Sequence, residues 1–98
     1  MHKPAFAVLT LLCSAPLFAA PSPAKEPACR MCHGPGGAAP MAPSYPKLAG
    51  QNKDYLISAM KAYRDGKRND SMAIMMAAQM MSLSDSDIEE LATFYSLQ

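Results

Sequence analysis

Apolar residues recur at helical spacing in two segments of the second half of the chain. Between Asn52 and Asp65 they follow an i, i+3, i+4, i+7 pattern: Leu56, Ala59, Met60 and Tyr63. Asn52 is a favourable N-cap and Gly66 a typical stop, so this pattern predicts a helix from about Asn52 to Asp65. The same spacing recurs after Ser84, at Ile88, Leu91, Ala92 and Tyr95. Ser84 and Asp87 have the form of a capping motif, which predicts a last helix beginning at Ser84.

A methionine-rich piece between these segments predicts a further helix over residues 71–81. Its methionines are Met72, Met75, Met76, Met80 and Met81. Residues 34–50 are rich in Gly, Pro and Ala, which predicts a loop, and Tyr45, Leu48 and Ala49 at its end suggest that it packs on something. Pro21, Pro23 and Pro27 leave room for no more than a short turn before residue 29. Because no segment alternates like a strand, we expect an all-α protein.

The N-terminus has the pattern of a secretory signal peptide. A short positive region, Met1 to Lys3, precedes an apolar run from Ala5 to Leu12 and a zone of small residues. We expect residues 1–24 to be removed by cleavage after Ala24, leaving residues 25–98 as one domain in the periplasm. The apolar run is too short for a membrane-spanning helix, so we expect no membrane anchor. Cys13 follows Leu12 instead of a small residue, which argues against acylation.

Charge changes the picture little. The whole chain has 98 residues, with nine Lys and Arg against eight Asp and Glu. Loss of Lys3 with the signal would leave eight against eight, a balance that gives no support for nucleic-acid binding. A domain of about 75 residues has a marginal hydrophobic core, and a large buried cofactor would offset that weakness.

The main chemical signal is Cys29-Arg30-Met31-Cys32-His33, which has the Cys-x-x-Cys-His form of a c-type haem attachment site. The two thiols can form thioethers to the haem vinyl groups, and the adjacent imidazole can ligate the iron. A thioredoxin-like dithiol would require a surrounding βαβ pattern, which is missing. A structural zinc site needs four ligands, and no Cys or His follows His33 in the sequence. These alternatives are weaker than the attachment of one covalent haem c.

The segment 25–98 resembles the small bacterial periplasmic class I cytochromes c. The resemblance covers Cys29–Gly34, Pro46–Gln51, Tyr63–Asp70 and Leu83–Ile88. It implies a small cytochrome c fold around one haem, with Cys29 and Cys32 as attachment residues and His33 as the proximal iron ligand. It also implies that the Pro46 carbonyl accepts a hydrogen bond from the proximal imidazole and that Leu48 packs on the haem.

In this family the distal methionine typically lies seven residues before the leucine of the Leu-Ser-Asp cap, which here indicates Met76. Helical geometry alone does not separate Met76 from Met75, Met72 or Met80. The family's N-terminal helix would be short or missing, because only residues 25–28 separate the expected cleavage site from Cys29. A partner subunit is then a candidate to cover an exposed face containing Leu91 and Tyr95.

An iron with both axial positions filled favours one-electron transfer over substrate chemistry, so we expect an electron carrier and no enzyme. His/Met ligation should raise the reduction potential relative to bis-histidine ligation. Redox proteins would be its donors and acceptors, with the basic side chains as a possible docking patch: Lys47, Lys53, Lys61, Lys67 and Arg68. Two alternatives remain open, a dedicated subunit of a dehydrogenase or oxidase and a haem sensor or peroxidase-like protein with an open distal site.

Overall fold

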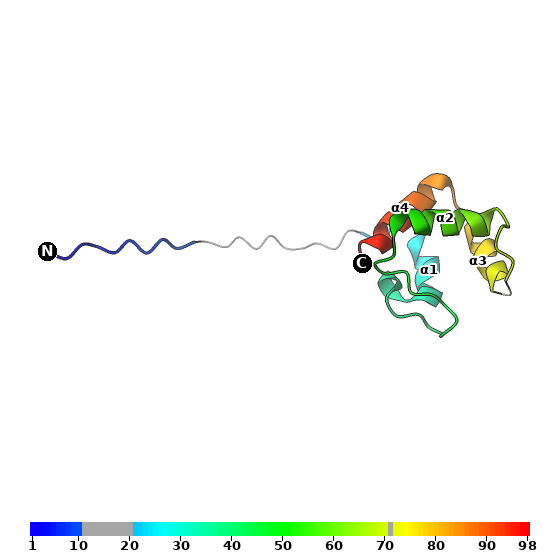
Figure 1. The fold of residues 1–98 in the computed structure, drawn as a ribbon, viewed down its shortest axis with the longest axis horizontal. Helices are drawn as coiled ribbons and strands as arrows, with labels where there is room; N and C mark the ends of the chain where they lie inside the picture. Colours follow the sequence, from blue (N-terminus) through cyan, green and yellow to red (C-terminus); the bar gives the residue numbers. More distant parts are fainter. Residues whose placement is uncertain (11–20, 71) are drawn as a thin grey trace.

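The computed structural model describes residues 1–10, 21–70 and 72–98. Within these ranges the chain forms four α-helices, one 3₁₀ turn and no strand, which confirms the all-α prediction. The elements are α1 (Glu26–His33), η1 (Pro35–Gly37), α2 (Lys53–Arg64), α3 (Ala73–Met80) and α4 (Asp85–Ser96). Figure 1 shows α2 lying against α4, with α3 at one end of the pair.

Both helices that were predicted from apolar spacing are present, and their N-terminal caps are formed. The Asn52 side chain accepts a hydrogen bond from the Tyr55 backbone N–H at 2.9 Å and opens α2. Ser84 and Asp87 form a reciprocal capping box at the start of α4, each side chain accepting from the other's backbone N–H at 3.0 Å. These caps satisfy backbone donors that a helix start leaves unpaired.

The core lies where α4 meets α2 and α3. Its buried members are Leu56, Met80, Leu83, Ile88, Leu91, Ala92 and Tyr95. Leu56 comes from α2 and Met80 from α3, and the last four of these residues form the predicted stripe of α4. Arg64 ties the end of α2 to the start of α4, since it forms an ion pair with Asp85 at 2.8 Å and donates a hydrogen bond to the Leu83 carbonyl at 3.3 Å.

The segment before residue 29 is more ordered than the sequence predicted. Instead of a turn, α1 is a two-turn helix that begins at Glu26 and includes the Cys-x-x-Cys-His motif. Pro27 falls in its first turn, where a backbone N–H would have no intrahelical partner, so the proline starts the helix instead of breaking it. The N-terminal helix is therefore short but present.

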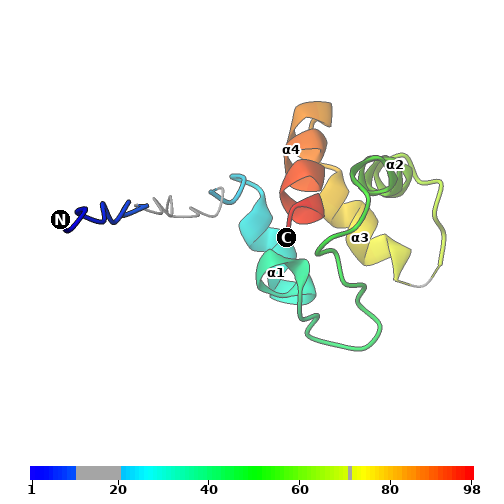
Figure 2. The same cartoon turned by 60° about the vertical axis from the view of Figure 1, so that its left-hand side comes forward.

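The prediction of an exposed face at Leu91 and Tyr95 is wrong. Leu91 and Tyr95 are buried within the chain itself, at 0% and 2% exposure. Figure 2 shows α1 beside the C-terminal end of α4, and the Tyr95 hydroxyl donates a hydrogen bond to Glu26 Oε1 at 3.4 Å. Because both residues are buried within the core of the chain, no partner subunit is needed to cover them.

The methionine-rich helix is shorter than predicted. It runs from Ala73 to Met80, with Met72 and Met81 as its flanking residues, and Ser71 lies outside the described residues. Its N-cap residue, Met72, makes no capping hydrogen bond with its own side chain. Because apolar residues continue on both sides of the helix, the sequence pattern alone does not mark where it starts and stops.

Residues 1–10 have no regular structure and extend away from the helices (Figure 1). The remainder of the predicted apolar signal segment, with Cys13, lies outside the described residues. Removal of residues 1–24 by cleavage after Ala24 stays a prediction. In the part of the chain that the structure describes, no helix has the length and apolar character required to cross a membrane.

Candidate haem site

The last turn of α1 carries the three residues of the motif. Cys29 and Cys32 are three residues apart and therefore share one side of the helix, next to His33 at its end. His33 is buried, whereas Met31, between the two cysteines, is largely exposed. The helix ends at Gly34, which adopts φ +81°, a conformation that L side chains rarely adopt. The predicted attachment residues are thus presented together by a single helical turn.

The loop after α1 folds back to hold the imidazole. His33 Nδ1 lies 2.7 Å from the Pro46 carbonyl oxygen, so the protonated Nδ1 donates to that carbonyl and Nε2 remains available as a ligand. This is the contact that the resemblance implies. A hydrogen bond of this kind fixes the ring orientation and raises the basicity of the ligating nitrogen.

Two glycines make this fold-back possible. The Gly37 carbonyl accepts hydrogen bonds from the backbone N–H groups of Leu48 and Ala49 at 2.9 and 3.1 Å, which brings the two ends of the loop together. A Cβ added at Gly37 would meet the Leu48 Cβ at 2.7 Å. At Gly34, an added Cβ would lie 2.2 Å from the Ala39 carbonyl oxygen. Both positions require glycine for space as well as for conformation.

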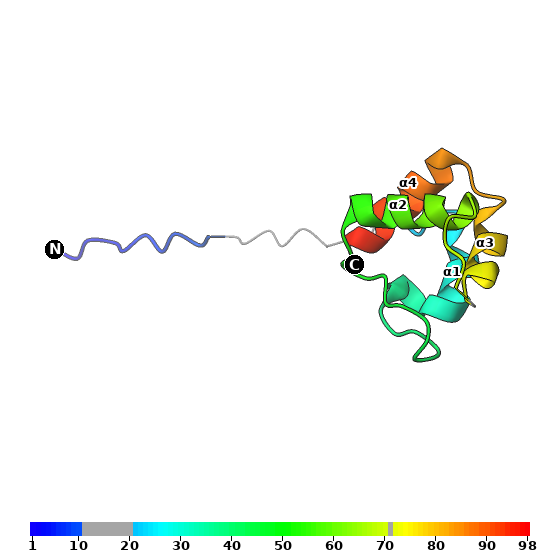
Figure 3. The same cartoon turned by 45° about the vertical axis from the view of Figure 1, so that its right-hand side comes forward.

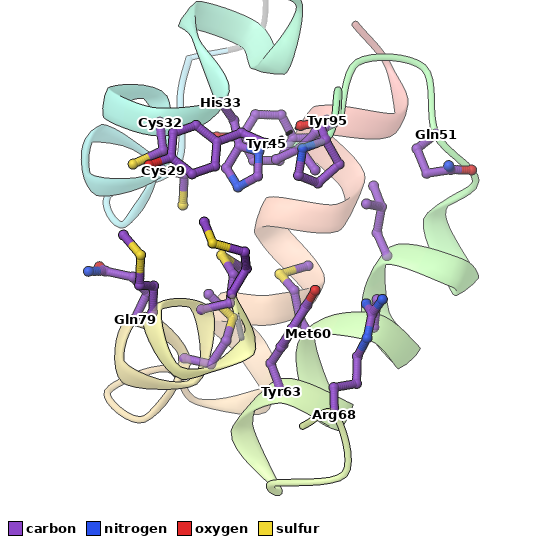
Figure 4. Close-up of a pocket in the computed structure, with 18 of the residues that line it drawn as sticks. Cys29, Cys32, His33, Tyr45, Gln51, Met60, Tyr63, Arg68, Gln79 and Tyr95 are labelled. Carbon is purple, nitrogen blue, oxygen red and sulfur yellow. Dashed lines mark hydrogen bonds between the residues drawn. The ribbon is translucent and has the colours of Figure 1, made fainter. Parts of the chain in front are cut away.

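A cavity of about 460 Å³ lies in front of His33 and the two cysteines. Figure 3 shows α1, the loop, α2 and α3 arranged around this region, and Figure 4 shows its walls. Cys29, Cys32 and His33 lie on one side, and Gln79 of α3 with Met60 of α2 lies on the other. The lining is mainly apolar; Pro46 and Leu48 both contribute to it, and Leu48 also packs against the core.

Several methionines of the predicted distal group line this cavity, but in different environments. Met72, Met75, Met76 and Met80 all contribute to the lining. Met75 is half exposed, whereas Met80 is 2% exposed and belongs to the closed core. Met76 is partly buried and packs against the core, so it differs from the half-exposed Met75 and from the fully enclosed Met80. Met72 flanks the start of α3 and is 36% exposed.

Tyr95 and Glu26 are two site neighbours whose positions the sequence analysis missed. Tyr95 lines the cavity beside Cys29, although its spacing in α4 indicated only a core residue. Burial raises the pKa of the Cys29 thiol, while a hydrogen bond with Tyr95 opposes that rise. Burial also raises the pKa of the Tyr95 hydroxyl well above its usual range, so this group stays protonated. The only sequence signal for Glu26 was its i, i+4 relation to Arg30.

The predicted basic patch is not a uniform surface. Lys47 and Arg68 line the cavity, and Arg68 lies over the Tyr63 ring at 4.4 Å from its centroid. Lys53 pairs with Glu89 at 3.6 Å. Part of this positive charge is therefore used within the protein, and Lys47 and Arg68 are the members that stand at the site.

The residues around the cavity fit a c-type haem. Two free thiols three residues apart, an imidazole with Nε2 available and soft thioethers on the opposite wall are the donors that this group uses. The mainly apolar lining suits the faces of a porphyrin. Fold and site together define a class, the small all-α proteins that bind one haem through Cys-x-x-Cys-His.

Comparisons with known proteins identify the family within that class. The cytochrome c family profile matches residues 17–95. The chain is 47% identical to cytochrome c-554(548) of Halomonas halodenitrificans over 70 residues, covering 71% of this chain and 83% of that protein. It is 40% identical to a cytochrome c4 of Pseudomonas aeruginosa over 90 residues, which cover 92% of this chain. The chain therefore belongs to the cytochrome c family.

Other relatives are longer than this chain. The match spans 43% of the Pseudomonas aeruginosa cytochrome c4 and 38% of a thiosulfate dehydrogenase electron acceptor of Thiomonas intermedia, to which this chain is 36% identical. Membership of the family establishes the covalent haem c and the electron-transfer function that the sequence predicted. The donors, the acceptors and the identity of the axial ligands are treated below as proposals.

Proposed function

We propose that this protein is a periplasmic one-electron carrier whose single haem c is attached to Cys29 and Cys32 and ligated by His33 and Met76. The observation that carries the proposal is that the two proposed iron ligands line opposite walls of one cavity. His33 is held by the Pro46 carbonyl on one wall, and Met76 is supported by the core on the other. When bound, the haem supplies a reversible Fe(III)/Fe(II) couple.

The surrounding residues favour electron transfer with little movement. The imidazole is fixed by a 2.7 Å hydrogen bond, and Leu48 and Tyr95 line the cavity while packing into the core. Apolar surroundings and a neutral thioether both favour the reduced, less charged iron, so a comparatively high reduction potential is expected. A site that changes its ligands and packing little between oxidation states suits a carrier better than an enzyme.

The proposal is tested by redox titration and carbon monoxide binding on the exported holoprotein. A carrier with both axial positions filled should show a single reversible one-electron transition, and its ferrous form should bind carbon monoxide poorly at pH 7. Rapid and stoichiometric carbon monoxide binding would show an open distal site. That result would favour the sensor or peroxidase-like alternative.

A second candidate, a dedicated subunit of a dehydrogenase, is supported by the names of two relatives, from Thiomonas intermedia and Stutzerimonas stutzeri. Each of these two proteins is called a thiosulfate dehydrogenase electron acceptor. The structure removes one argument for this alternative, because the face of Leu91 and Tyr95 is already covered by the chain itself. Purification of a tagged chain from its native periplasm distinguishes the dedicated subunit from the free carrier. Co-purification of a stoichiometric dehydrogenase polypeptide would favour the subunit, and recovery of the cytochrome alone would favour the free carrier.

A further inference from the structure

Glu26 is an unusual residue for the interior of so small a domain. It is 1% exposed, and a buried carboxylate is costly unless other groups stabilise its charge. Two groups do so. Arg30 donates through Nε to Glu26 Oε2 at 2.8 Å and forms an ion pair with the same oxygen through Nη2. The Tyr95 hydroxyl donates to Oε1 at 3.4 Å.

Glu26 also shares the inner face of α1 with the haem-site residues. Positions 26, 29 and 33 follow an i, i+3, i+7 pattern, and Glu26 and His33 are the two buried residues of this helix. Seven residues of α-helix correspond to about 10 Å along the axis. The carboxylate therefore stands behind Cys29 and Tyr95, which line the cavity, and close enough to His33 for its charge to be felt there.

Water screens the two charges of the Glu26–Arg30 ion pair unequally. The Arg30 side chain is 44% exposed and faces water, whereas the Glu26 carboxylate is enclosed by protein. Water screens the exposed guanidinium strongly and the buried carboxylate weakly. The pair should therefore act on the interior as a net negative field, although its formal charge is zero.

From this arrangement we propose that Glu26 tunes the reduction potential of the protein: its buried negative charge favours the oxidised iron and lowers the potential. Tyr95 is a positioning residue for Glu26, because its hydroxyl donates a hydrogen bond to the carboxylate and holds it behind the cavity wall. The same contact joins α1 to α4. The inference rests on the proposed His33-ligated haem and adds a residue that the attachment motif does not contain.

The test is a redox titration of the holoprotein with Glu26→Gln, which keeps the size of the side chain and one acceptor oxygen but removes its charge. At pH 7 and a fixed applied potential, the ratio of reduced to oxidised protein should rise about three- to tenfold, as expected for a weakly screened charge roughly 10–15 Å away. Glu90→Gln makes the same charge change on the exposed face of α4 and should leave the ratio within a factor of about 1.5.

Two further variants separate charge from packing. Glu26→Asp retains the charge on a shorter side chain and should stay close to the wild-type potential even where it lowers the unfolding midpoint. Tyr95→Phe removes one donor from the carboxylate, strengthens its field and should lower the reduced fraction, the opposite direction to Glu26→Gln. Equal shifts in Glu26→Gln and Glu26→Asp would overturn the inference, because geometry would then be the cause.

The failure of this inference is distinguishable from failure of the proposed function. A wild-type protein with a normal one-electron transition that Glu26→Gln leaves unchanged overturns the role of Glu26 alone. A wild-type protein without any reversible transition overturns the carrier function and this inference together.

Discussion

The two walls of the haem site are built in opposite ways. On the wall formed by α1 and the following loop, each contact needs one particular residue: His33 meets the Pro46 carbonyl, and Gly34 and Gly37 occupy positions with no space for a side chain. On the wall formed by α3, four methionines line the cavity, and the N-cap residue Met72 makes no capping hydrogen bond with its own side chain. The first wall specifies one ligand, whereas the second offers several of the same chemistry.

The hydrogen bonds of the two walls indicate that the first wall is the more rigid one. The loop is joined to itself by the two hydrogen bonds at Gly37 and to α4 by a bond from the Gly50 N–H to the Tyr95 carbonyl at 2.9 Å. On α3, Ile74 and Met75 are at least half exposed, and only the Ala73, Met76 and Met80 side faces the core. We therefore expect glycine substitutions in the loop of the first wall to act on stability and methionine substitutions on the second wall to act on ligation.

The largest effect is expected from Met76→Ala. Removing the supported thioether should open the distal position, lower the reduction potential and allow carbon monoxide to bind the ferrous protein. Met75→Ala is the matched control, since it removes the neighbouring, half-exposed thioether and should leave the ligation spectrum intact. Visible and near-infrared spectra of both variants provide the measurement. If Met75→Ala is the variant that loses the spectrum, the assignment transfers to Met75.

Gly34→Ala should be the most destabilising small substitution on the first wall. The new Cβ would lie 2.2 Å from a backbone oxygen at φ +81°, and the combined clash and strain should cost about 2–4 kcal/mol. Gly66→Ala also adds a methyl at positive φ, but nothing lies within 4 Å, so only about 1 kcal/mol is expected. Denaturant unfolding of the two holoproteins measures the difference. Equal losses would mean that the loop is not tightly fitted.

A smaller effect is expected from Ser84→Ala, which removes the capping box at the start of α4. Losing this cap typically costs about 1 kcal/mol. Ser86→Ala, at an exposed position of the same helix, should change the free energy of unfolding by less than about 0.5 kcal/mol. The cap lies at the start of α4 and belongs to neither wall of the haem site. The haem spectrum of both variants should therefore match the wild type. A changed spectrum in Ser84→Ala would contradict the view that the cap acts on stability alone.

The smallest effect concerns acid stability. A hydrogen bond from Arg64 is the main cause that holds the pKa of Asp85 below its ordinary value of 3.8, and the charges of Lys61 and Arg64 add to it. Because the folded pKa is the lower one, the contribution is present above that ordinary value and is lost as pH falls through the folded pKa. Asp85→Asn should therefore be slightly less stable than the wild type at pH 6, and this difference should shrink as the pH falls below 3.8 and disappear below the folded pKa. A difference that persists in acid would require another explanation.

The sequence predicted the parts of the fold that local signals specify. Asn52 and Ser84 marked two helix starts, and the apolar spacing after each identified the faces that contribute to the core. The motif placed Cys29, Cys32 and His33 together on one turn, because three-residue spacing leaves little freedom. It did not predict α1, because prolines usually interrupt a helix. Pro27 does not, since it lies in the first turn of α1.

Other features depend on contacts between distant segments, which spacing does not encode. Leu91 and Tyr95 are buried in the core with Leu56 of α2 and Met80 of α3, and Glu26 meets Tyr95 across 69 positions of sequence. The choice among the methionines has the same cause: all of them suit the chemistry. Core packing separates Met76 from Met72 and Met75, and its partial exposure separates it from Met80.

The central claim is that one covalent haem lies between His33 and Met76 in the cavity that both walls enclose. The most direct test is the visible and near-infrared spectrum of the exported protein, oxidised and reduced, recorded beside a haem-stained denaturing gel. We predict haem that stays with the polypeptide on the gel and a six-coordinate, low-spin His/Met spectrum. A high-spin spectrum would contradict the distal assignment, and the absence of covalent haem would contradict the account of the site as a whole.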